Sequence, residues 1–537
     1  MGKKRQFIKT IGIGTVIVFG NTVTAVAQST AGVDANPSLT WELSQSTDNT
    51  QDTTTEIILP GREPIDNTET LNPSSNPLSF PTEAEEVDVE TQRPITLEQA
   101  IELALKNNKD IQQARLELER SEFELREARA GLFPTLDLGS GLTYGNAAFL
   151  DSIPEQNIEA LAEDELERDP TLSDDEAQII AEQRITNTDS ASFNFDSNLT
   201  LGYDIYNGGF RGANISAARK QLRSSELNLE SIVEESRFET SRDYYSLQNS
   251  DAQVEIQEAA VEDAQQTLKD AQLLERAGLG TRFDVLRAEV ELAQAQQRLS
   301  TAIANQNIAR RQLAETLSVS HDTELATADK IEEAGIWELS LPESIVQAFK
   351  NRAELEQLLL QREIADDQRT IALSEVRPRV SANASYALGN DFENDDIDFN
   401  DNYQVGLNLQ WRLFDGGAAR ASARQAEKDG EIAETQFADQ RNQIRFNVEQ
   451  AFYGLESNQR NITTATKEVE LAEESLRLAR LRFQAGVGTQ TDVIDAQTQL
   501  TTARGNLLSS IIDYNQSYVS LQRQVSNTPD NGLQDLP

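Results

Sequence analysis

The sequence contains no cysteine, one histidine (His321) and one methionine (Met1) among its 537 residues. A chain without cysteine forms no disulfide and no thiolate site, and a single histidine supports neither a Cys/His metal site nor a histidine-based triad. Chemistry by carboxylates alone stays open, but no motif indicates a pocket for it. We therefore predict that the protein is not an enzyme and holds no metal ion and no cofactor.

Long apolar runs are also missing. The sequence has no stretch of 18 consecutive apolar residues and so no candidate for a membrane-spanning helix. Residues 1–27 combine four basic residues, a short apolar run over 11–20 and Ala-Val-Ala at 25–27, which is the pattern of a signal peptide. No cysteine follows, which excludes a lipoprotein anchor. Such an exported chain either stays in solution beyond the inner membrane or crosses a membrane as β-strands.

Basic residues are few: 47 Lys and Arg stand against 90 Asp and Glu, a formal net charge of −43. Residues 1–27 hold four bases and no acid, so the remaining chain carries −47. Phosphate binding requires a basic surface, which excludes nucleic acid as a partner. Acidity with few aromatic residues can also indicate disorder. We predict disorder for the leader 28–93, rich in Pro, Ser, Thr and acids, and for the tail 526–537.

The part between leader and tail is internally duplicated. Residues 97–107 reappear at 341–351, an offset of 244, whereas residues 278–286 reappear at 486–494, an offset of 208. The offset falls because the first copy has a longer acidic middle near 146–190, where we predict an insertion-tolerant loop. The sequence therefore predicts a first structural repeat over 94–320 and a second over 338–525.

Each repeat contains two segments in which apolar and polar residues alternate. They span 136–144, 193–205, 380–388 and 403–413. Each has about the length of a tilted membrane-crossing strand. One such strand alone would also fit an antiparallel sheet on a soluble core. Four of them in an exported chain favour a transmembrane antiparallel β-barrel. Because four strands cannot close a barrel, we expect several chains, and three would supply 12 strands.

A long helix is expected from residue 418 to residue 485. Large apolar residues recur every seven positions from Val448 to Phe483, mostly with alanine between them, which is the seam of a coiled coil. At 1.5 Å per residue this helix would be on the order of 100 Å long. A simple coiled-coil fibre is the alternative, but it does not explain why each seam is joined to a strand of membrane length.

Each long helix ends at a glycine-rich turn. The turn residues are Gly278, Gly280 and Thr281 in the first repeat and Gly486, Gly488 and Thr489 in the second. Glycine permits the positive φ that ends a helix, and threonine is a preferred N-cap of the next helix. We therefore predict two helical hairpins per chain, with their tips far from the membrane.

The sequence around the second turn also carries a family resemblance. It reads Arg482-Phe483-x-x-Gly486-x-x-Thr489-x-x-Asp492-Val493-Ile494-Asp495-Ala496-Gln497, with a partial copy at 277–288. With the duplication, it resembles the TolC-like outer-membrane efflux family over about 95–525. The resemblance implies a homotrimer, with a 12-stranded barrel, four strands per chain, in outer-membrane lipid, continuous with a long periplasmic α-helical coiled-coil barrel.

The resemblance further implies a function and partners. The trimer would be a passive exit duct for tripartite drug or solute efflux, for type I protein secretion, or for both. It would work with a periplasmic adaptor (membrane fusion) protein and with an inner-membrane efflux pump or ABC transporter. Two alternatives stay open: a structural coiled-coil tether between outer membrane and cell wall, and a general porin. The long helices argue against the porin.

Roles for single residues follow from the same motif. In the family, paired aspartates on the second returning helix line the periplasmic constriction; by motif match these are Asp492 and Asp495. The two Gly/Thr turns would be the adaptor-docking tips. A tyrosine and an arginine that form gate contacts in the best-known member correspond to Phe483 and Gly488, so other contacts must hold a gate closed here.

Each of these sites also has a structural interpretation. Asp284 and Asp492 stand at the third position of a helix, where the helix dipole favours a carboxylate. Asp495 lies beyond the first turn, and its repeat mate is Arg287. This departure from the repeat favours a pore role for Asp495. The glycines and threonines of the tips are turn-forming residues first.

Overall fold

The structure, a computed structural model, describes residues 62–73, 92–145, 155–186, 192–320, 323–391 and 399–525, with isolated positions between 76 and 82. The predicted signal peptide, most of the predicted leader, the tail 526–537 and His321 lie outside the described residues. Among the helices of the described part, none is both long enough and apolar enough to cross a membrane.

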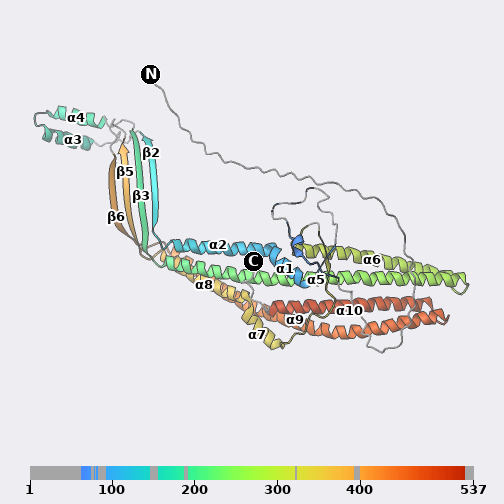
Figure 1. The fold of residues 1–537 in the computed structure, drawn as a ribbon. Coiled ribbons are helices and arrows are strands. Elements are labelled where there is room, and N and C mark those ends of the chain that lie inside the picture. The colour runs from blue at the N-terminus through green and yellow to red at the C-terminus, as the bar shows by residue number, and fades with distance from the viewer. Residues whose placement is uncertain are drawn as a thin grey trace, which may run out of the picture. The chain divides into compact units, whose positions relative to one another are not determined.

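The described chain is mostly helical with two small sheets, and its elements follow one order twice (Figure 1). The first repeat comprises α1 (Leu97–Asn107), α2 (Lys109–Ala130), β2 (Thr135–Gly145), α3 (Glu155–Arg168), α4 (Asp174–Thr186), β3 (Ser192–Asn207), α5 (Phe210–Arg276) and α6 (Arg282–Thr316). The second comprises α7 (Leu341–Asn351), α8 (Ala353–Ser374), β5 (Arg379–Asp391), β6 (Asn400–Gln410), α9 (Ala418–Gln484) and α10 (Gln490–Val525). Three short elements complete the described chain: the 3-10 turn η1 (Thr68–Leu71) and the strands β1 (Gln92–Ile95) and β4 (Glu324–Thr327).

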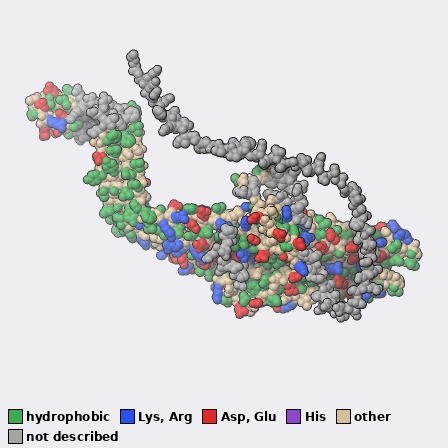
Figure 2. Space-filling view, in the orientation of Figure 1, with side chains coloured by type: hydrophobic (Ala, Val, Ile, Leu, Met, Phe, Trp, Pro, Cys, Tyr) green, Lys and Arg blue, Asp and Glu red, His purple; other side chains and the backbone are tan. Residues whose placement is uncertain are grey.

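The four alternating segments form one antiparallel sheet in the order β2-β3-β5-β6. The register pairs apolar residues directly across the strands: Leu138 with Leu199, Leu199 with Tyr386, and Tyr386 with Tyr403. Side chains at every second position share one face of a sheet, so this face is apolar. These side chains are exposed in the single chain, and Figure 2 shows hydrophobic groups gathered over the strands.

The helix before each first strand is broken into two, which the sequence analysis did not predict. Asn108 is the C-cap of α1, and its side chain accepts hydrogen bonds from two amides that begin α2. Asparagine favours such caps over helix interiors, and this explains the break. At the equivalent break in the second repeat, the buried guanidinium of Arg352 lies 2.9 Å from Glu354, and Arg523 of α10 lies 3.0 Å from the same carboxylate.

The acidic stretch that was predicted to be a loop contains the helical hairpin α3–α4 (Figure 1). Its turn is specified locally: Asp169 accepts two hydrogen bonds from Thr171, and Ser173 forms a capping box with Glu176. Ala177 and other alanines are buried between the two helices. The prediction of a loop failed because small alanines at the contact give little apolar periodicity.

The long helices agree with the predicted seam. Helix α9 is 67 residues long and ends one residue before the predicted end. Its heptad positions are buried against α10, among them Val448 at 0% and Val469 at 2% exposure. Helix α5 is also 67 residues long and packs along α6 in the same way. Each of these long helices begins after a pair of glycines with positive φ, Gly208–Gly209 and Gly416–Gly417.

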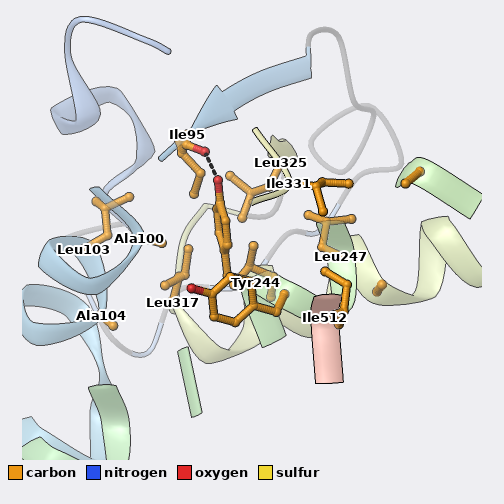
Figure 3. Close-up of a cluster of buried hydrophobic side chains, with 14 of the residues drawn as sticks. Ile95, Ala100, Leu103, Ala104, Tyr244, Leu247, Leu317, Leu325, Ile331 and Ile512 are labelled. Carbon is orange, nitrogen blue, oxygen red and sulfur yellow. Dashed lines mark hydrogen bonds between the residues drawn. The ribbon is translucent and has the colours of Figure 1, made fainter. Parts of the chain in front are cut away.

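The largest buried cluster lies midway along the helices, where both repeats contribute. Tyr244 of α5 is its central aromatic, surrounded by Ile95 and Leu247 of the first repeat, by Leu325 of β4 and by Ile512 of α10 (Figure 3). The parallel pair β1–β4 borders this cluster. We call this cluster the equatorial core. It joins the two hairpins of a chain through apolar contact.

Part of the predicted leader is ordered against the equatorial core. Leu71 is 1% exposed, and its carbonyl oxygen accepts a hydrogen bond from the amide of Ser320 (3.1 Å). The guanidinium of Arg62 lies 3.8 Å from the buried carboxylate of Asp251. Burial of an apolar side chain offsets the entropy lost on ordering a polar segment. For this reason residues 62–73 are ordered, although the sequence analysis predicts disorder for the whole leader.

Candidate constriction and hairpin tips

The two hairpin tips have the same backbone. Gly278 and Gly486 take φ values of +74° and +73°, which side-chain-bearing residues rarely adopt. The amides of Gly280 and Gly488 then donate to the carbonyl groups of Leu274 and Arg482, both at 3.0 Å. These bonds close the ends of α5 and α9. The predicted turn residues therefore lie together at each tip.

The second glycine of each tip lies so close to the end of the preceding helix that a side chain would not fit without movement. A Cβ atom on Gly488 would lie 3.0 Å from both the backbone nitrogen of Phe483 and the Cβ atom of Arg482. Gly280 is only slightly less crowded, with the nearest atom at 3.1 Å. Between the glycines the turns expose Leu279 and Val487, 81% and 72% accessible. Each tip thus exposes one apolar side chain on a tightly packed turn.

The threonines and the first aspartates cap the returning helices. Thr281 and Asp284 form a complete capping box at α6. At α10 the amide of Thr489 donates to the carboxylate of Asp492 (2.9 Å), and the amide of Asp492 donates to the Thr489 hydroxyl (3.2 Å). Hydrogen bonds from the backbone amide and the side chain of Thr489 to the carboxylate lower the pKa of Asp492, so the carboxylate stays ionised. Asp492 thus has a structural role in addition to its predicted one.

Asp495 has no such role. Its side chain is exposed and makes no hydrogen bond or ion pair with any residue that the structure describes. It lies three positions after Asp492, so both carboxylates lie on the same exposed side of α10, while Val493 and Ala496 pack against α9. The structure thus brings the two predicted constriction residues to one side of one helix end.

Several polar contacts between the hairpins were not predicted. Asp263 of α5 accepts from Arg480 of α9 (2.6 Å), and Arg287 of α6 donates to Thr491 of α10 (2.6 Å). The side chain of Gln497 reaches α5 as well. A signal was present in the sequence: the positions 208 residues away from Asp263, Arg480 and Arg287 hold Leu471, Gln272 and Asp495. These residues depart from the repeat because they contact different neighbours.

Among the described residues, no group of three or more His, Cys, Asp or Glu side chains is close enough to hold a metal ion. Asp492 and Asp495 belong to one chain and provide only two carboxylates. What the tips offer is a pair of exposed negative charges on a rigid helix start, beside a tight turn.

The sequence matches the family described as Outer membrane efflux protein over residues 100–318 and 344–525. The chain belongs to this family. It is 28% identical to the outer membrane efflux protein BepC of Brucella suis over 36% of this chain and 41% of BepC. It is 24% identical to the cobalt-zinc-cadmium resistance protein CzcC of Cupriavidus metallidurans over 80% of this chain and 90% of CzcC.

Solved outer-membrane channels have the same fold. The CmeC channel of Campylobacter jejuni aligns with a TM-score of 0.65 at 14% identity, covering 87% of this chain and 98% of CmeC. The outer membrane protein VceC of Vibrio cholerae aligns at 0.63 and 19% identity, covering 80% and 95%. Family membership confirms the predicted resemblance, the outer-membrane location and the expectation that the protein is not an enzyme. The chain spans about half the length of several curated relatives that it matches.

Proposed function

We propose that three copies of this chain assemble into a passive exit duct of the outer membrane. The observation that carries the proposal is the four-stranded sheet. One of its faces is apolar, exposed along β2, β6 and much of β3 and partly exposed along β5, and within the described residues β2 and β6 each pair on one side only. Exposed strand edges and an apolar face are costly in water, and both are removed when several sheets close into a barrel in lipid.

Three copies would give 12 strands, enough for a water-filled lumen. The long helices α5 and α9 continue from strands β3 and β6 after short connections, so the helices of three chains would continue the wall into the periplasm. A porin needs no such wall, and a tether needs no barrel. The arrangement of strand and long helix in one chain therefore favours the duct over both alternatives.

We propose that the tips are the docking sites for a periplasmic adaptor protein. Each tip exposes an apolar side chain, Leu279 or Val487, on the tight Gly/Thr turn. Energy would come from an inner-membrane efflux pump or ABC transporter held by that adaptor. The cargo would be drugs or other solutes, or proteins in type I secretion. Asp492 and Asp495 from three chains would form an acidic ring at the narrow periplasmic opening.

The test is single-channel recording of the purified full-length protein in planar bilayers, with its size measured in mild detergent. We expect a trimer and discrete conductance steps. A tether would insert without conducting. A general porin would conduct at a high level that does not change when the tips are altered. A monomer that remains in solution without detergent would contradict the architecture.

A further inference from the structure

A pocket of about 280 Å³ lies between α2 and α5, beside the helix break at Asn108. Its lining residues recur at intervals of one helical turn, so each helix contributes one face to it. We call it the α2–α5 pocket. Apart from Asn108, it is lined by Asp110, Gln113, Ala114 and Glu117 of α2 and by Ile232, Glu235, Ser236 and Glu239 of α5.

The α2–α5 pocket is negatively charged. Four carboxylates line it, whereas no lysine or arginine does. Glu235 lies 2.9 Å from Arg523 of α10. The other three carboxylates form no ion pair with any residue that the structure describes. Burial and the neighbouring carboxylate of Glu235 raise the pKa of Glu239. Like charges held this close together favour a positively charged ligand.

A buried hydroxyl group in the pocket also lacks a partner. Ser236 is 4% exposed, and its Oγ atom makes no hydrogen bond with any described residue. Ile232 and Glu239, one turn before and one turn after it, both line the pocket, so the side chain of Ser236 is directed into it. Buried polar groups are nearly always hydrogen-bonded, because an unmade bond is costly. A ligand with N–H donors would supply the missing partner.

The second repeat shows that folding does not require these residues. With the offsets of 244 for α2 and 208 for α5, the three glutamate positions of the pocket hold amides, Gln361, Gln443 and Asn447. The position of Ser236 holds Ile444, which is 0% exposed in an apolar cluster. The same helix pair therefore forms without the charges and without the hydroxyl group. Their presence in one copy only indicates a role other than folding.

The arrangement of the charges indicates the class of ligand. Among the described residues, no three acidic side chains are close enough to share one metal ion. Asp110 and Glu117 are two helical turns apart, about 10 Å along α2. A ligand that pairs with separated carboxylates carries positive charges that are themselves separated. Between them the pocket offers the apolar side chains of Ile232 and Ala114.

We propose that the α2–α5 pocket binds a linear polyamine, a chain of methylene groups that joins two or more ammonium groups. The ammonium groups donate to the carboxylates of Glu117 and Glu239 and to the hydroxyl of Ser236, since an ammonium group has donors and no acceptor. The methylene chain lies against Ile232. Such a ligand joins α2 to α5 beside the helix break. The pocket is separate from the hairpin tips, and its binding does not require the proposed duct to conduct.

The test is isothermal titration calorimetry of the full-length protein in mild detergent at physiological salt, with spermidine as the probe. The double variant Glu117→Gln/Glu239→Gln removes two charges from the pocket. The matched control is Glu119→Gln/Glu258→Gln, which removes two charges from exposed positions of the same two helices outside the pocket. Ser236→Ile introduces the residue of the second repeat and fills the pocket while its charges remain.

We expect one spermidine per chain, bound at least tenfold more weakly by the Glu117→Gln/Glu239→Gln variant, because charge-assisted hydrogen bonds are lost. The control should stay within about twofold of the parent protein, as expected for screened surface charges. Ser236→Ile should also bind at least tenfold more weakly. Absence of saturable binding to the parent, or equal weakening in both double variants, would overturn the proposal. Displacement of spermidine by Mg²⁺ at equal ionic strength would do the same, since the pocket would then accept any cation.

Thermal unfolding provides a second measurement. A ligand that binds only the folded protein raises the unfolding midpoint. Spermidine should therefore raise the midpoint of the parent and of the control, and leave that of Glu117→Gln/Glu239→Gln unchanged. The midpoints without spermidine report whether each variant is folded. If the Glu117→Gln/Glu239→Gln variant does not fold, Ser236→Ile decides in its place: an unchanged affinity for spermidine in that variant contradicts the site.

Discussion

The hydroxyl group of Tyr244 lies 2.8 Å from the carboxylate of Asp329, 85 positions away along the chain. The same carboxylate accepts the amide of Leu97 at 2.7 Å, where α1 begins. One aspartate thus connects the middle of α5, the start of the first repeat and the linker to the second. This connection lies at the equatorial core, where the two hairpins of the chain are in apolar contact.

Tyr244→Phe should destabilise the protein by about 1–2 kcal/mol, because the half-buried carboxylate of Asp329 loses a donor while the ring remains. Tyr244→Ala should cost more, about 3–5 kcal/mol, since it adds a cavity. Thermal unfolding followed by helical circular dichroism in detergent measures both. Tyr453→Phe is the control, because that ring is 58% exposed. Equal midpoints for the Tyr244→Phe and Tyr453→Phe variants would show that the hydrogen bond is unimportant.

The pair of arginines around Glu354 predicts a dependence of stability on pH. Burial by itself would raise the pKa of Glu354, but the guanidinium groups of Arg352 and Arg523 outweigh it and lower the pKa to about 2. The ionised form therefore stabilises the fold fully above the ordinary glutamate pKa of 4.5, and this contribution is lost as pH falls toward 2.

Glu354→Gln should lower the free energy of unfolding at neutral pH by on the order of 3 kcal/mol, because two buried guanidinium groups then face each other. The loss should shrink between about pH 4.5 and pH 2, where the parent protein loses the same charge. Glu470→Gln, on the exposed surface of α9, is the control. A difference between parent and Glu354→Gln that stays constant with pH would argue against this role.

Gly488→Ala should loosen the second tip, because the new methyl group would clash with the backbone of Phe483. We expect a cost of about 1–3 kcal/mol, seen locally as faster hydrogen exchange of the turn amides. Gly505→Ala is the control within the same hairpin. A methyl group there meets nothing within 4 Å, and alanine should stabilise the helix by up to about 1 kcal/mol. Unchanged exchange in Gly488→Ala would mean that the turn can relax.

Asp495→Ala should weaken block of the channel by multivalent cations added from the periplasmic side. A ring of carboxylates concentrates counter-ions at the opening. Asp492→Ala should also fray the start of α10, costing about 1 kcal/mol, since Asp492 is part of the helix cap. A diffuse acidic surface is screened within about 8–10 Å near physiological salt, whereas a narrow ring keeps its effect. Unchanged block by Asp495→Ala in high salt would exclude the ring.

The second repeat predicts that the α3–α4 hairpin is dispensable for assembly. Strands β5 and β6 pair in the same sheet with only residues 392–399 between them. Replacing 146–191 by a copy of 392–399 should leave outer-membrane insertion and trimer formation intact, as measured by fractionation and size in detergent. A scrambled copy of the same eight residues is the control for loop sequence. Loss of insertion in both would assign a folding role to the hairpin.

Periodicity determined how much of the structure could be predicted from the sequence. The seam around Val448 and the alternation around Leu199 repeat many times, so the long helix and the strands were located within a few residues. A contact that occurs only once produces no periodic pattern in the sequence, and so it cannot be predicted in this way. The burial of Leu71 in the equatorial core and the contact of Asp263 with Arg480 each depend on a distant neighbour, and the break at Asn108 depends on a single local cap. Only the comparison of the two repeats pointed to the contact of Asp263 with Arg480.

The glycine pairs that begin the long helices determine where movement can occur. Only Gly208 and Gly209 separate the end of β3 from the start of α5, and a Cβ atom on Gly208 would lie 2.8 Å from the carbonyl oxygen of Ser374 on α8. At Gly416 and Gly417 the same test finds open space. The connection between β3 and α5 is therefore packed tightly against the second repeat, whereas the glycine pair before α9 has free space around it. A force applied at the tips should therefore rotate α9 relative to β6 more readily than it rotates α5 relative to β3. One long helix of the chain can then twist while the other stays fixed.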